Sequence, residues 1–108
     1  MKNNKTYIEN ILDSIKKIEE FTKEVTKENF VENQMMQSAT ILQLALIGEE
    51  ANKISNDTKF KINLAWREIV GFRNMAFHDY INLEINIVWD TIQEDLPILK
   101  KELQKPLE

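Results

Sequence analysis

The chain has 108 residues, the size of one domain, and a formal net charge of −4. It contains no cysteine, which excludes disulfides, thiolate zinc sites and a cysteine nucleophile, and only two glycines and two prolines, too few for a turn-rich β architecture. The negative balance argues against a broad attraction to nucleic acid or anionic lipid, so any phosphate-binding site has to be local.

Nothing in the sequence points to a membrane or to export. The N-terminal residues lack the apolar stretch of a signal peptide, and the longest near-apolar run, Ile41–Ile47, is far too short to span a bilayer. We therefore expect a cytoplasmic protein with no membrane partner. The final dipeptide, Leu107-Glu108, is typical of a cloning site that precedes a tag, and we base no argument on it.

A first amphipathic helix is predicted over residues 6–25. Thr6 and Glu9 have the spacing of a capping box at its start. Apolar residues recur at helical intervals from Ile8 to Val25, and charged residues fill the other side. This pattern indicates a helix with one face packed against the rest of the domain.

Residues 29–54 are predicted to form a second helix about 39 Å long, longer than the core of such a domain needs. Thr26 or Asn29 is expected to cap its start. Within Ile41–Ile47, six of seven residues are apolar, so the apolar surface is wider than a single stripe. Either three other helices or a second copy of the chain has to cover it, and we favour a homodimer.

The third helix follows a loop that we predict from Ser55 to about Ile62. Asn63 is expected to cap this helix, which begins at Leu64 and frays near Tyr80. It carries most of the chemically distinctive residues of the chain.

A fourth helix is predicted after Asn82, its expected cap, and the helical period of apolar residues continues to Leu103. Pro97 interrupts the pattern and predicts a kink or a short restart with Asp95 as a local cap, which would add a short C-terminal helix. The expected architecture is all-α: an antiparallel up-and-down bundle of four main helices, in a single domain over residues 1–108.

The segment Trp66–Tyr80 is unusual in its cations. It holds the single histidine, His78, and both arginines, Arg67 and Arg73. The other twelve of the fourteen lysine and arginine residues are lysines, and none of them lies between Lys61 and Lys100. Arginine offers a planar fork that matches a phosphate edge, and an imidazole can exchange protons near neutral pH. The segment is therefore the candidate functional site.

On a helical wheel this third helix has two distinct faces. The predicted core face is apolar. The second face carries polar groups and a glycine at positions i, i+4, i+7 and i+11. The core face consists of Ile69, Phe72 and Ala76, and the second face consists of Arg67, Gly71, Asn74 and His78.

Gly71 is an unfavourable residue at this position, since glycine costs about 1 kcal/mol in a helix interior relative to alanine. We expect either a neighbouring helix or a ligand to approach its backbone. Arg67 shares this face and is a candidate for substrate binding.

Arg73 and His78 cannot simply lie side by side on an ideal helix, because residues five apart point about 140° from each other. Three arrangements would bring them together. The helix ends before His78, or Arg73 folds along the surface, or two chains contribute the two groups across a dimer axis. The wide apolar surface of the second helix favours the dimer.

Together, these two side chains have the chemistry needed for RNA cleavage without a metal. A guanidinium holds a phosphodiester and stabilises the charge that builds on it, while an imidazole takes the proton of a ribose 2′-OH or protonates the leaving oxygen. One histidine cannot be base and acid at once, but a dimer supplies two. The alternative is structural: His78 caps the helix end, and Arg67 forms surface ion pairs with Glu68 and Glu84.

The run Arg73–Tyr80, RNMAFHDY, fits the R-N-x-x-x-H pattern of the HEPN superfamily. In its longer form, R-x-x-x-x-H-x-Y, it resembles the HepT-like branch of prokaryotic ribonuclease toxins. The resemblance extends to Gly48–Ser55, Trp66–Gly71 and Val88–Pro97, and so covers essentially the whole chain.

This resemblance implies a helical up-and-down bundle and a homodimer with its catalytic cleft at the interface. Arg73 and His78 carry over as catalytic residues, and Asn74 as the polar residue that orients them. The resemblance also implies a nucleotidyltransferase antitoxin as partner, which adenylylates Tyr80.

We therefore predict a metal-independent endoribonuclease toxin that uses no cofactor, acts on RNA and has no DNA partner. Glu49 and Glu50, on the second helix, are interpreted as structural or orienting partners of the arginines and not as metal ligands. The alternative function belongs to another class: a non-catalytic helical module that holds a nucleotide or a protein in the same cleft.

Overall fold

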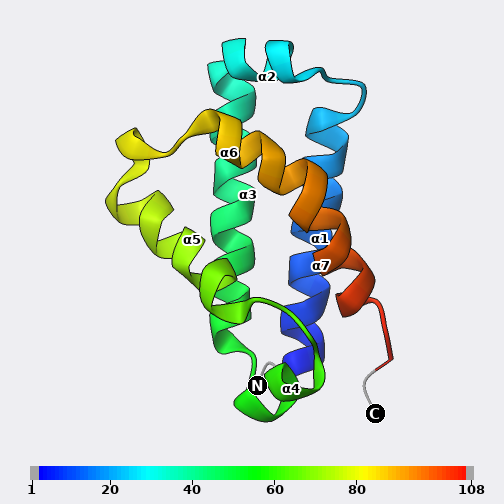
Figure 1. Cartoon of the computed structure of the whole chain (residues 1–108). Helices are drawn as coiled ribbons and strands as arrows, with labels where there is room; N and C mark the ends of the chain where they lie inside the picture. Colours follow the sequence, from blue (N-terminus) through cyan, green and yellow to red (C-terminus); the bar gives the residue numbers. More distant parts are fainter. Residues whose placement is uncertain (1–2, 107–108) are drawn as a thin grey trace.

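The computed structural model describes residues 3–106, so Leu107-Glu108 lies outside it. Its central element is α3 (Gln34–Lys53), which packs between α1 (Asn4–Thr22) and α5 (Trp66–His78) and runs antiparallel to both (Figure 1). The predicted all-α, up-and-down helical bundle is confirmed.

α1 begins two residues earlier than predicted because Asn3 caps it. The Asn3 side chain accepts the backbone N–H of Thr6 at 3.0 Å, so the predicted capping box that begins at Thr6 is wrong. The helix ends at Thr22, close to Glu24, whose φ is 60°. Its buried face matches the predicted apolar periodicity and consists of Ile8, Ile11, Ser14, Ile15 and Ile18.

The prediction of one long second helix over residues 29–54 is wrong, because the helix is interrupted at Asn33. This residue has extended backbone angles, φ −108° and ψ 94°, and its side chain accepts the N–H of Met36 at 2.9 Å. It thus ends α2 (Lys27–Glu32) and caps α3. Thr26 caps α2, as one of the two predicted alternatives.

The predicted loop after α3 is also helical. Ser55 caps the short helix α4 (Asn56–Lys61). Asn63 does not cap α5, whose N-cap position is Ala65 with no side-chain hydrogen bond. Instead, the indole N–H of Trp66 donates to two carbonyls at the end of α4, each at 3.1 Å, and joins the two helices.

α5 is followed by a single 3-10 turn, η1 (Tyr80–Asn82), and by α6 (Ile85–Asp90). The prediction that Asn82 caps the next helix is wrong. Its side-chain amide donates to the Asp79 carboxylate at 2.7 Å, and Glu84, at the N-cap position of α6, makes no side-chain cap bond.

The last part of the bundle runs through α6, the π-helical segment η2 (Thr91–Asp95) and α7 (Leu96–Leu103), and crosses in front of α3 and α1 in Figure 1. The predicted short C-terminal helix at Pro97 is confirmed: the proline lies in the first turn of α7, directly after the π-helical segment η2. Asp95 makes no capping hydrogen bond, so that detail was wrong.

The hydrophobic core lies where α1, α3 and α7 meet. α2 closes one end of it through Phe30, which is fully buried and packs against Trp89 with ring centroids 5.2 Å apart. None of the helices in residues 3–106 is both long enough and apolar enough to cross a membrane.

Candidate active site

Arg73 lies on α5 and reaches across to α3. Its Nε donates to Oε2 of Glu49 at 2.7 Å, in an ion pair whose two side chains are each about one-third exposed. Glu49, which was predicted to orient an arginine, is therefore in direct contact with Arg73. Glu50 is engaged elsewhere, since it accepts the Lys53 ammonium at 2.7 Å and the Asn10 amide.

The ion pair depends on a close approach of the two helices at Gly48. A Cβ at this position would lie 2.6 Å from Cβ of Arg73 and 2.8 Å from the carbonyl oxygen of Ile69. Both are held by the α5 backbone, so neither can move aside without moving the helix. Only glycine allows this spacing, and sequence reasoning missed Gly48 although a glycine inside an apolar helical run was a signal for it.

Gly71, the glycine that sequence reasoning selected, has no such contact. A Cβ there would meet nothing within 4 Å outside its own helix turn, and the residue is exposed. Of the two alternatives predicted for Gly71, a neighbouring helix or a ligand, the first is therefore wrong within residues 3–106. Its backbone is open to solvent.

Two further groups fix the Arg73 guanidinium. Nη1 donates to Oδ1 of Asn74 at 2.8 Å, and Cζ lies 5.0 Å from the centroid of the Phe77 ring. The guanidinium thus contacts a carboxylate, an amide and an aromatic face, a combination of charge-assisted hydrogen bonding and cation–π attraction. Asn74 is therefore in direct contact with the arginine that the resemblance expects it to orient.

His78 is the last residue of α5 and is exposed. Within the described residues its imidazole makes neither a hydrogen bond nor an ion pair. Because α5 continues through His78, the arrangement in which the helix ends before it is wrong. Arg73 turns toward Glu49 on α3, and no hydrogen bond joins it to His78 within residues 3–106. In the described part of the chain, one copy supplies both groups with no hydrogen bond between their side chains.

The second face of α5, which the helical wheel separated from the core face, is open to solvent. Arg67, Asn74 and His78 are all exposed, and Ala76 on the opposite face is buried. In the described part of the chain Arg67 forms no ion pair, so the surface pairing proposed as its alternative role is absent there. It remains an available cation about two turns before Asn74.

Tyr80 follows α5 in η1, two residues after His78. Its hydroxyl lies 3.0 Å from the Ser38 hydroxyl, at hydrogen-bonding distance, and connects η1 to the first turns of α3. Tyr80 as a whole is 46% exposed, so it lies at the surface of the bundle.

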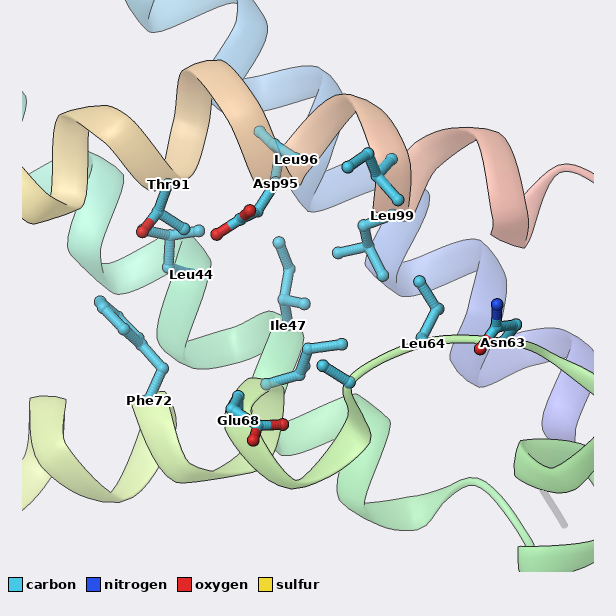
Figure 2. A pocket seen from close by; sticks show the side chains of 13 residues that line it. Leu44, Ile47, Asn63, Leu64, Glu68, Phe72, Thr91, Asp95, Leu96 and Leu99 are labelled. Carbon is cyan, nitrogen blue, oxygen red and sulfur yellow. The ribbon is translucent and has the colours of Figure 1, made fainter.

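A separate apolar groove lies on the other side of α5 (Figure 2). It has a volume of about 480 Å³, with Leu44 and Ile47 of α3 as its floor, Phe72 of α5 on one side and Leu99 of α7 on the other. None of the site residues named above lines it. The candidate active site is therefore a surface formed by α3, α5 and η1, and not this groove.

Comparisons with known proteins give the family of the chain. Residues 11–106 match the family model described as "Ribonuclease HepT-like". "Putative RNase MJ1380" of Methanocaldococcus jannaschii is 37% identical over 93% of each chain. "Probable ribonuclease HepT" of Thermococcus cleftensis is 36% identical over 96% of each chain. No solved structure gives a significant match.

The match covers nearly all of the described helices, and it includes α3, α5 and η1, from which the Arg73 and His78 surface is built. The chain belongs to the HepT-like ribonuclease family.

Proposed function

We propose that the protein is a metal-independent endoribonuclease whose active site combines Arg73 and His78 from two copies of the chain. The observation that carries this proposal is the state of the two side chains. Arg73 is held in one orientation by Glu49, Asn74 and Phe77, while His78 is exposed and unpaired within the described residues. An oriented guanidinium and a free imidazole are the groups that phosphodiester cleavage needs.

The chemistry is an internal transfer at phosphorus. One His78 imidazole takes the proton of a ribose 2′-OH, and the 2′ oxygen bonds to phosphorus. The P–O5′ bond breaks, and the protonated His78 of the second copy donates a proton to the departing oxygen. Arg73 stabilises the charge on the phosphoryl oxygens. The products are a 2′,3′-cyclic phosphate and a 5′-hydroxyl.

The outward face of α3 supports a homodimer. Met35, Leu42 and Leu46 are exposed and recur with the 3.5-residue average spacing that places them in one stripe. Glu49 continues the same stripe, so a second copy packed along α3 would end next to the Arg73 ion pair. A dimer interface along this stripe would bring two copies of α5 near one substrate.

The toxin–antitoxin assignment rests on the family resemblance and on the position of Tyr80. A nucleotidyltransferase partner would transfer AMP from ATP to the phenol oxygen, with release of pyrophosphate. Tyr80 is 46% exposed, and its hydroxyl lies within hydrogen-bonding distance of the Ser38 hydroxyl, at 3.0 Å. An anionic nucleotide two residues from His78 would then exclude RNA by its size and its charge. Such a pair is expected to act in the cytoplasm.

Labelled RNA separates the enzyme from a binding module that uses the same cleft. We expect cleavage that persists in EDTA and falls by about 10²- to 10⁴-fold in His78→Ala and by about 10²- to 10³-fold in Arg73→Ala. RNA with a 2′-deoxy group at the cleavage site should stay intact. Nucleotide or protein binding by a wild type that cleaves no RNA would support the binding module.

Mass spectrometry of the protein co-expressed with the nucleotidyltransferase tests the modification. We expect an added AMP group on the Tyr80 peptide, and none in Tyr80→Phe. Tyr7, the other tyrosine of the chain, is the internal control. An unmodified Tyr80 in a complex that no longer cleaves RNA would contradict this part of the proposal.

A further inference from the structure

Glu49 is in an unexpected place for a ribonuclease, because a carboxylate next to the arginine lowers the positive charge that faces RNA. Two consequences of the ion pair therefore oppose each other. The carboxylate weakens the attraction of the site for a polyanion. It also restricts the orientation of a long, flexible side chain. The geometry of the contact indicates which of the two matters more.

The contact uses the inner edge of the guanidinium. Glu49 accepts from Nε at 2.7 Å, and Asn74 accepts one N–H from Nη1 at 2.8 Å. The second N–H of Nη1 and both N–H groups of Nη2 have no acceptor among the described residues. Three N–H groups of Arg73, two of them on Nη2, can therefore still donate to a phosphate while Nε is anchored.

The anchor has a specific structural basis. Glu49 follows Gly48 directly, and Gly48 is the point at which α3 and α5 approach too closely for a Cβ. The short distance between the helices brings the carboxylate to Nε of Arg73. Phe77 supports the guanidinium from one more direction at 5.0 Å.

We propose that Glu49 is a positioning residue for RNA cleavage, which holds the inner edge of Arg73 so that its terminal edge faces the scissile phosphate. This inference rests on the proposed function, since it assumes that Arg73 acts on the phosphate. Glu49 does not touch RNA. Its contribution appears in the rate of the chemical step and not in the affinity for substrate.

Two conservative variants separate the effect of the length of the Glu49 side chain from the effect of its charge. Glu49→Gln loses the charge but keeps an oxygen at the same distance that accepts the Nε–H. Glu49→Asp keeps the charge but withdraws the carboxylate by one methylene. A positioning role predicts kcat within a few-fold of wild type for Glu49→Gln, and a kcat lower by roughly 10- to 100-fold for Glu49→Asp and Glu49→Ala.

KM supplies the second readout. Glu49→Ala removes a carboxylate beside the site, so KM for RNA should be unchanged or lower. Any decrease in KM should become smaller at high salt. Glu68→Ala is the matched control: Glu68 is an exposed carboxylate on α5 with no ion pair in the described chain, and its loss should change neither constant appreciably. Circular dichroism and melting of each variant confirm that it is folded.

The outcomes are distinguishable. Wild-type kcat in folded Glu49→Asp and Glu49→Ala, or a higher kcat in Glu49→Ala, would overturn the positioning role, provided that Arg73→Ala and His78→Ala are inactive in the same assay. If Arg73→Ala and His78→Ala cleave RNA as wild type does, the proposed function itself is wrong. A low kcat in Glu49→Asp with near-normal kcat in Glu49→Gln supports the inference.

Discussion

α1 and α5 pack against opposite sides of α3, yet they are buried very differently (Figure 1). α1 buries five residues, and α7 covers it as well. α5 buries only Ala76, and a groove of about 480 Å³ separates it from the C-terminal helices. α1 therefore contributes mainly to the stability of the core. α5 presents polar groups to solvent and is held mainly by its close contact with α3.

The two interfaces also use different contacts with α3. α1 meets it through branched apolar side chains such as Ile11 and Ile15, which tolerate small shifts at a cost in packing. α5 meets it at Gly48, where Cβ of Arg73 and the carbonyl oxygen of Ile69 leave no room for a methyl group. The first interface should therefore respond to loss of volume, and the second to added volume.

Ile11→Ala should have the largest effect on stability. Ile11 is completely buried on α1, and removing its side chain leaves a cavity, which should lower the free energy of unfolding by about 2–5 kcal/mol. Urea denaturation measures this value. Ile81→Ala, at a residue that is 93% exposed, should change it by less than about 0.5 kcal/mol. Equal effects of the two variants would contradict the contrast between core and surface.

Gly48→Ala should cost about 1–3 kcal/mol by overpacking the seam between α3 and α5, and should also lower kcat for RNA because Arg73 is displaced. Gly71→Ala is the matched control. The added methyl group lies on α5 in open space, and the substitution should raise the free energy of unfolding by up to about 1 kcal/mol. A tolerated Gly48→Ala with normal kcat would show that the close approach is not needed.

Phe72→Ala tests how much the groove side of α5 contributes. Phe72 is half-buried and lines the groove, so we expect a loss of only about 1 kcal/mol, less than for Ile11→Ala. Phe60→Ala removes a ring that is 93% exposed and should have almost no effect. A loss comparable with that of Ile11→Ala would mean that α5 is as firmly integrated as α1.

Leu42→Lys should have the smallest effect on the folding of one chain, within about 0.5 kcal/mol, because Leu42 faces outward from α3. It should, however, shift the sedimentation of the protein from dimer to monomer and reduce cleavage. Ile87→Lys, on α6 and away from the α3 stripe, is the control and should remain dimeric. A wild-type monomer would contradict the proposed shared site.

Most helices could be predicted from local patterns, but their ends could not. The apolar periodicity of α1 gave its buried face correctly, whereas Asn3 replaced Thr6 as its cap. The predicted helix over residues 29–54 failed at Asn33, where a side-chain cap competes with helix continuation. A continuous helix and a capped break are compatible with the same hydrophobic pattern. Small differences in hydrogen-bond free energy decide which of the two forms.

The sequence by itself determined the helical class, the outward face of α5 and the confinement of Arg73 and His78 to one segment, because these follow from composition and the helical period. Only the tertiary structure decided that Glu49, 24 residues earlier, anchors Arg73, and that Gly48 and not Gly71 is the glycine with a close neighbour. The helical period specifies which side of a helix a residue faces. It does not specify how closely two helices approach, which depends on the packing of the whole bundle.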